Sequence, residues 1–164
     1  MEKIWHELLL PTGNFNTLTE LSISSCGKLI TIFPSSLVQL LQNLVDLSIS
    51  NCDLLKDLCE GHNATLVTLP RIKNFKLLSL PSLKDIWWSK VCPESLNFRN
   101  LTHLTIGGCK CRRYLLSFTP SKLLIQLQYL ELVECDMMKE IRNYLSFTSL
   151  NCQNSQASTK GIVL

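Results

Sequence analysis

Eight cysteines and three histidines are the residues of this 164-residue chain that could hold a metal ion or carry a nucleophile. The tightest grouping is Cys109-x-Cys111, with His103 shortly before it. Structural zinc sites usually take four ligands, with about two to four residues between paired cysteines, and a nucleophilic cysteine needs an oriented base. One residue separates Cys109 from Cys111, and His6, His62 and His103 stand in different contexts. A Cys/His metal or catalytic protein stays an alternative; we expect no metal, no cofactor and no enzyme activity.

A repeat explains where the cysteines stand. If the first apolar residue is counted as position 1, the repeat has apolar residues at positions 1, 4, 6 and 12 and a Cys or Leu at position 9. The five copies begin at Leu18, Leu44, Ile72, Leu101 and Leu127, which are 26 to 29 residues apart. Apolar residues also stand three positions before and after each copy, and the one exception to the pattern is Arg112 in the fourth copy. A period of about 20–29 residues with this spacing is the leucine-rich repeat signature.

Four cysteines share one position of this repeat, namely Cys26, Cys52, Cys109 and Cys135. A thiol behaves as a small hydrophobe with a weak hydrogen-bond donor, so it can reach a neighbouring backbone carbonyl without burying a charge. We therefore predict a column of buried thiols rather than disulfides. Unpaired thiols are typical of reducing compartments, and we expect a cytoplasmic location.

The centre of each copy alternates between apolar and small or polar residues, as in Leu47-Ser48-Ile49-Ser50 and Leu104-Thr105-Ile106-Gly107. A period of two indicates a strand with one buried face. Each strand can pair only with the same strand of the next copy, so neighbouring repeats must stack. We predict an α/β leucine-rich repeat solenoid: a curved parallel sheet with one short strand per repeat, and loops and short helices on the convex side, with helices over 35–41 and 120–126.

The repeat pattern also sets the domain organisation. We predict one leucine-rich repeat domain over residues 1–142, with a partial repeat at 1–14 and five repeats that start near 18, 44, 72, 101 and 127. Residues 143–164 leave the pattern and are mostly polar, so we expect this tail to be disordered. The pattern begins inside a repeat without a recognisable cap, and solenoids need caps. We therefore expect the chain to be a fragment of a longer protein.

Charge and hydropathy exclude several partners. The net charge of +3 is spread without a basic stripe, so nucleic acid is not indicated. No apolar run approaches the roughly 20 residues that a membrane helix needs, and we expect no membrane partner. The triplets Asn63-Ala64-Thr65 and Asn100-Leu101-Thr102 match the glycosylation acceptor pattern, which leaves an extracellular leucine-rich repeat receptor ectodomain as an alternative.

With the repeats aligned, the chain resembles the leucine-rich repeat region of plant coiled-coil nucleotide-binding (NB-ARC) disease-resistance proteins. The stretches that carry the resemblance are residues 18–29 with the following Phe33-Pro34-Ser35-Ser36-Leu37, residues 127–141, and the Leu-Pro-containing coil at residues 78–87. The resemblance covers residues 1–142. The Gly-x-Ile-Pro element usual in plant receptor ectodomains is missing.

The resemblance implies a protein–protein interaction module that acts as the sensor of an intracellular immune receptor, in pathogen recognition and the defence response. Its partner would be a pathogen effector, a guarded host protein or the receptor's own nucleotide-binding domain. The chain has no Gly-rich phosphate loop that ends in Gly-Lys-Ser/Thr. We therefore assign no nucleotide site to these residues and expect the nucleotide-binding domain to be missing from the fragment.

The outward strand positions define the concave face, where we expect the partner to bind. This face is small, polar and mixed in charge, and Tyr129 and Leu78 are its sizeable anchors. The candidate residues are Glu20, Ser22, Ser24, Asp46, Ser48, Ser50, Asn74, Lys76, Leu78, His103, Thr105, Tyr129, Glu131 and Val133, with Gly107 at the remaining outward position.

Overall fold

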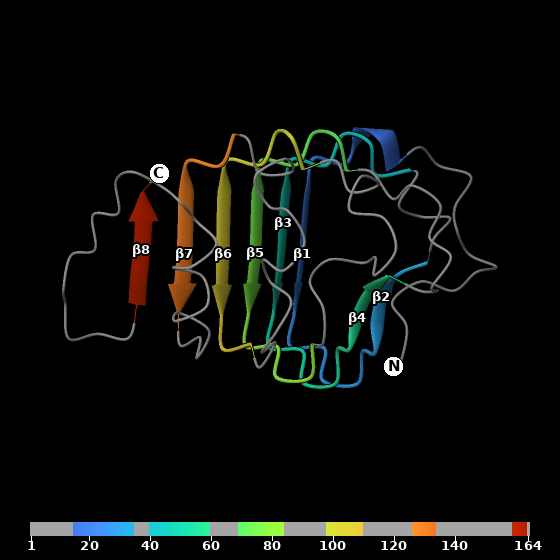
Figure 1. The fold of residues 1–164 in the computed structure, drawn as a ribbon. Helices are drawn as coiled ribbons and strands as arrows, with labels where there is room; N and C mark the ends of the chain where they lie inside the picture. The colour runs from blue at the N-terminus through green and yellow to red at the C-terminus, as the bar shows by residue number, and fades with distance from the viewer. Residues whose placement is uncertain are drawn as a thin grey trace, which may run out of the picture.

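The computed structural model describes residues 15–34, 40–59, 69–83, 98–109, 126–133 and 159–163. Nearly all of its regular structure is strand, as Figure 1 shows. The elements are the 3₁₀ turn η2 (Phe15–Thr17) and the strands β1 (Glu20–Ser24), β2 (Thr31–Phe33), β3 (Asp46–Ser50), β4 (Asp57–Cys59), β5 (Asn74–Leu78), β6 (His103–Gly107), β7 (Tyr129–Val133) and β8 (Thr159–Val163).

The main sheet has the strand order β1-β3-β5-β6-β7-β8 (Figure 1). Its first five strands are parallel, and each comes from one copy of the repeat. The register joins the same repeat position throughout: Leu21 pairs with Leu47, Leu47 with Phe75, Phe75 with Leu104, and Leu104 with Leu130. The parallel pairing of one main-sheet strand from each repeat is therefore confirmed.

The alternation of residue types within each strand separates a buried face from an exposed one. In β5, Phe75 and Leu77 are buried, while Asn74 and Lys76 are exposed. The buried residues of all five repeats form one hydrophobic cluster, and the ring of Phe75 stacks on that of Phe98 at 5.9 Å between centroids. Burying a leucine or phenylalanine side chain stabilises a fold by about 1.5–3 kcal/mol, so this cluster is the main source of stability.

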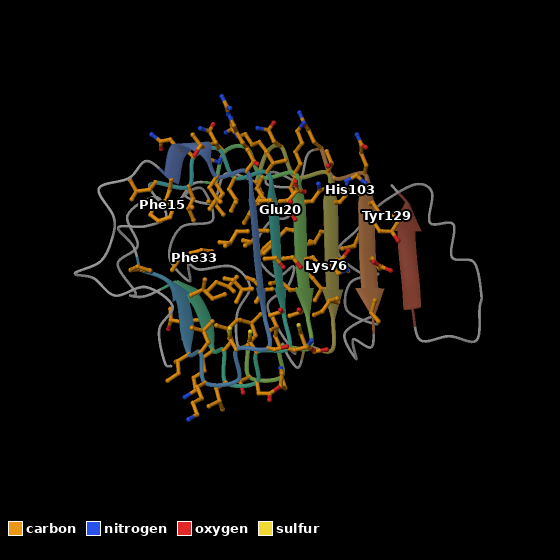
Figure 2. All side chains as sticks on the ribbon, turned by 180° about the vertical axis from the view of Figure 1, so that it is seen from behind. Phe15, Glu20, Phe33, Lys76, His103 and Tyr129 are labelled. Carbon is orange, nitrogen blue, oxygen red and sulfur yellow. The ribbon has the colours of Figure 1, made fainter. Side chains whose placement is uncertain are left out.

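A second parallel pair, β2 with β4, lies where the chain leaves the main sheet. The carbonyl of Ile30 accepts hydrogen bonds from the N–H groups of Lys56 and Asp57, at 3.0 and 3.4 Å. Ile32, Phe33 and Leu58 point into the same core and are almost fully buried. Figure 2 shows side chains filling the space between the two sheets. The inward direction of Ile32 and Leu58 follows from the repeat, whereas the β2–β4 pairing was not expected.

The main-sheet strands of the first four repeats, β1, β3, β5 and β6, end in the same backbone turn. The next residue is left-handed in every case, with φ of 57° at Ser25, 53° at Asn51, 52° at Ser79 and 59° at Gly108. Its N–H donates to the carbonyl of the last residue of the following strand, at 2.8 to 3.1 Å. Left-handed φ is costly for most residues, so the turn geometry must be favoured by the stacking of the repeats.

One expectation meets the structure only in part, and another falls mostly outside the described residues. Thr159–Val163, inside the tail expected to be disordered, forms β8, which pairs antiparallel with β7. Its backbone groups are satisfied by the exposed edge of β7, an interaction that the polar composition of the tail does not reveal. The rest of the tail lies outside the described residues. So do 35–39 and 110–125, where the two short helices are predicted.

Within the described ranges, the structure contains no helix long and apolar enough to cross a membrane.

Leu47→Ala should lower the free energy of unfolding by about 2–5 kcal/mol, because the removed methyl groups leave a cavity in the core. Leu47 is 2% exposed, whereas Leu54, in the turn after β3, is 49% exposed. Leu54→Ala is therefore the matched control, with an expected change below about 0.5 kcal/mol. Urea unfolding monitored by circular dichroism measures both, and equal midpoints for the two variants would contradict the assigned register.

Candidate functional site

The outward residues of β1, β3, β5, β6 and β7 form one surface, called here the exposed face. The strand register arranges it in three rows of five. All fourteen residues proposed as the candidate site lie on this face, and none of them is buried. The first row is Glu20, Asp46, Asn74, His103 and Tyr129; the second is Ser22, Ser48, Lys76, Thr105 and Glu131; the third is Ser24, Ser50, Leu78, Gly107 and Val133.

The first row carries the most varied chemistry (Figure 2). The amide of Asn74 donates a hydrogen bond to the carboxylate of Asp46. The rings of His103 and Tyr129 are in contact, with centroids 5.8 Å apart and a 38° tilt. A hydrogen bond of 2.9 Å joins His103 Nδ1 to Thr102 Oγ1. The row therefore runs from two neighbouring carboxylates at one end to an aromatic pair at the other.

The second row has small side chains on β1 and β3, and charged side chains on β5 and β7. Ser22 and Ser48 are followed by the exposed Lys76. Thr105 Oγ1 then donates to Glu131 Oε2 at 3.2 Å. Across the rows, the face carries three acidic residues and one lysine, although the whole chain has a net charge of +3. The exposed face is thus more acidic than the rest of the protein.

The third row contains an apolar strip that the sequence alone did not show. A Cβ atom on Gly107 would lie 2.8 Å from Cδ2 of Leu78 and 2.9 Å from Cβ of Val133. Leu78 and Val133 therefore close over Gly107, which is buried although it occupies an outward position. The signal that could have revealed the strip is a glycine flanked by apolar residues at the same repeat position in both neighbouring copies.

Comparison with known families decides what kind of repeat builds this face. The family described as plant disease resistance protein RPS2-like, leucine-rich repeats, matches residues 1–136. The chain belongs to this family. Compared with curated proteins and with solved structures, the chain matches none.

In these RPS2-like repeats the cysteine column has a structural role. The thiol of Cys26 donates to the carbonyl of Ser24 at 3.4 Å, Cys52 to that of Ser50 at 3.3 Å, and Cys109 to that of Gly107 at 3.3 Å. Each thiol therefore binds the carbonyl that ends its own strand, and all three are reduced. The predicted thiol-to-carbonyl contacts are confirmed for these residues. The predicted burial is confirmed for Cys52 and Cys109, whereas Cys26 is half-buried, and Cys135 lies outside the described part of the chain.

The structure separates the residues that were considered for metal or nucleophilic chemistry. His103 begins β6 on the exposed face, whereas Cys109 is buried beyond the end of that strand. His6, His62 and Cys111 lie outside the described residues. Among the described residues there is no group of three or more His, Cys, Asp or Glu side chains that could hold a metal ion.

The acceptor triplet at Asn100 is placed, while Asn63 lies outside the described residues. The Asn100 side chain is exposed, but its amide nitrogen donates to the carbonyl of Pro70 at 2.6 Å. Asn43 makes the equivalent contact with the carbonyl of Asn16 two repeats earlier. This asparagine is therefore used to join neighbouring repeats.

Burial raises the pKa of the Cys52 thiol, with smaller effects from Cys26 and Asp53. Thiolate is the reactive form of cysteine, so Cys52 should be less ionised at pH 8 than an ordinary cysteine. We expect iodoacetamide at pH 8 to modify the half-buried Cys26 before Cys52 and Cys109. Peptide mass mapping over time measures the order, with alkylation in urea as the control. Reaction of Cys52 at the rate of the unfolded chain would contradict the buried column.

Gly107→Ala should destabilise the protein by about 1–3 kcal/mol, because the added methyl group collides with Val133 and Leu78. Gly27→Ala is the matched control, since a Cβ there meets nothing within 4 Å. We expect the control to change stability by less than about 0.5 kcal/mol. Equal urea midpoints for the two variants would show that the third row is not closed over Gly107.

Proposed function

We propose that the chain is a protein–protein interaction module, the sensor region of a plant intracellular immune receptor that takes part in pathogen recognition and the defence response. The observation that carries the proposal is the exposed face: five in-register strands of RPS2-like repeats present fourteen accessible side chains on one side of a sheet. Leucine-rich repeats generally bind proteins through such extended surfaces. In this proposal the repeats form a curved solenoid, with the exposed face on its concave side.

The chemistry of the face suggests how a protein partner would be oriented. Glu20 and Asp46 occupy directly paired positions, and like charges in such positions repel each other. A lysine or arginine of the partner placed between them would remove this repulsion. At the other end, the ring of Tyr129 and the Leu78–Val133 strip offer apolar contact, and aromatic residues are frequent binding hot spots.

The size of the face bears on how tightly it can bind. Strands are spaced about 4.8 Å apart and rise about 3.3 Å per residue, so five strands of five residues span roughly 400 Å² in projection. A stable interface buries about 800 Å² on each partner. The face is therefore large enough for part of an interface, and this supports the proposal that the chain acts within a longer receptor whose other parts complete the contact.

The remaining assignments belong to the same proposal. The partner is a pathogen effector, a guarded host protein or the receptor's own nucleotide-binding domain. We propose a cytoplasmic location, in agreement with three thiols at the same repeat position that are not joined in disulfides. No cofactor and no catalytic step are assigned to this chain.

Replacing Lys76 by Glu and Tyr129 by Ala together should weaken partner binding by about tenfold or more, since a charge in the middle of the face and an aromatic side chain at its β7 end are lost. The matched control combines Lys56→Glu with Leu54→Ala, which makes the same charge reversal and also shortens a large side chain, at exposed positions beyond β3. Each variant is used as bait in a plant extract, and the captured proteins are quantified by mass spectrometry.

The proposal requires a protein that the wild-type chain and the control variant retain and that the face variant loses, while both variants keep the same unfolding midpoint. A partner retained equally by all three baits would move the binding site away from the exposed face. Sugar on Asn63 or Asn100 in protein isolated from tissue would instead favour the receptor ectodomain.

A further inference from the structure

The outer edge of β7 binds a strand that does not belong to the repeat. A further repeat would add a parallel strand, as β3, β5, β6 and β7 do. β8 instead runs antiparallel, with Tyr129 opposite Val163 and Val133 opposite Thr159 (Figure 1). Addition of an extended segment to an exposed sheet edge is a common mode of peptide recognition. The edge of β7 is therefore used as a strand-binding site.

The backbone of β7 shows which groups carry this contact. The N–H of Tyr129 donates to Thr102 at 2.9 Å, and the carbonyl of Val133 accepts from Gly108 at 3.0 Å. Both residues thus face β6. Successive residues of a strand turn their backbone groups to opposite neighbours, so Leu130 and Leu132 face β8.

The register then identifies the matching groups of β8. Leu130 is opposite Ile162, and Leu132 is opposite Lys160. In an antiparallel pair, directly opposite residues either exchange both of their hydrogen bonds or none. Lys160 and Ile162 therefore turn their N–H and C=O groups to β7, while Thr159 and Gly161 turn theirs away.

Several features make β8 the most easily released strand of the sheet. It stands at the end of the strand order, so β7 is its one neighbour there. It contains Gly161 in its interior, and glycine weakens a strand. Residues 134–158 separate it from β7 along the chain, so its pairing also carries the entropy cost of closing a long connection.

We propose that the outer edge of β7 is a docking site for an extended antiparallel strand. Residues 159–163 of the same chain fill this site in the structure, and residues 159–163 of a second copy can take their place. The site recognises its occupant through the backbone groups of Leu130 and Leu132. The proposal does not depend on what the exposed face binds, because the edge and the face are different surfaces.

The test uses the full 164-residue chain labelled with ¹⁵N, and follows amide hydrogen exchange. Lys160→Pro with Ile162→Pro removes the two N–H groups that face β7. The matched control, Thr159→Pro with Gly161→Pro, also puts two prolines into β8, but at N–H groups that face away, where edge strands tolerate proline. We expect the first variant to speed exchange at Leu130 and Leu132 by about tenfold or more, and the control to leave it slow.

A peptide of residues 157–164 is then added to each chain. It should restore slow exchange at Leu130 and Leu132 in the Lys160→Pro, Ile162→Pro variant, while the same peptide with both prolines should not. Failure of the peptide to bind the opened edge would overturn the proposal. So would fast exchange at Leu130 and Leu132 in the wild-type chain, since β8 would then not be docked.

A second measurement covers the case in which the double-proline variant does not fold, as judged by fast exchange at Leu47 and Phe75. Peptide is added to the wild-type chain, where it must compete with a tethered strand whose effective concentration is of the order of millimolar. At peptide concentrations above that level, Ile162 of the labelled chain should lose protection while Leu130 keeps it. Unchanged protection of Ile162 would show that β8 is a fixed cap and would contradict exchange.

Discussion

A single repeat of this chain cannot bury its own apolar residues. Leu47 is covered because Leu21 lies on one side of it and Phe75 on the other, and the same holds for the next residues along the sheet. The rest of the structure depends on this stacking. It places the strands within hydrogen-bonding distance, it keeps the register that puts every outward residue on one face, and it favours the left-handed turns after the strands.

The backbone follows the same rule as the core. The carbonyl of Val45 accepts hydrogen bonds from both Lys73 and Asn74 of the next repeat, and that of Lys73 accepts from both Thr102 and His103, at 2.8 to 3.1 Å. These contacts cross from one repeat to the next rather than closing within a repeat. The cysteine thiols add contacts within each repeat, because each binds the carbonyl of its own strand end. Stability in such an array comes from the interfaces between adjacent repeats.

Much of this arrangement could be predicted from the sequence, because the repeated apolar pattern indicates both which residues point inward and which repeats are neighbours. The strands, the parallel pairing, the inward Ile32 and Leu58, and the thiol-to-carbonyl contacts of Cys26, Cys52 and Cys109 all follow from it. The β2–β4 pair was not predicted, since three residues per strand are too few for a period to be recognised. The pairing of β8 was also missed, because strand addition at an edge uses backbone groups that every sequence has.

The candidate site shows the same division. That the fourteen outward residues share one face follows from the period of two, and the structure places all of them there. The contacts within the face depend on side-chain rotamers and on distances between repeats, so the Asn74–Asp46 and Thr105–Glu131 hydrogen bonds were not predicted. The closure of Leu78 and Val133 over Gly107 was not predicted either. It depends on how three repeats pack together, because no single copy contains more than one of these residues.

The alternation along each strand has a consequence for how such a protein can change over generations. Inward positions hold the array together, whereas outward positions are not part of the buried cluster. Replacements at outward positions therefore cost little folding free energy, about 0.5 kcal/mol or less for surface sites in general. New specificities can therefore be sampled one residue at a time without loss of the scaffold. Gly107 is an exception among the outward positions, because any side chain there must displace those of Leu78 and Val133.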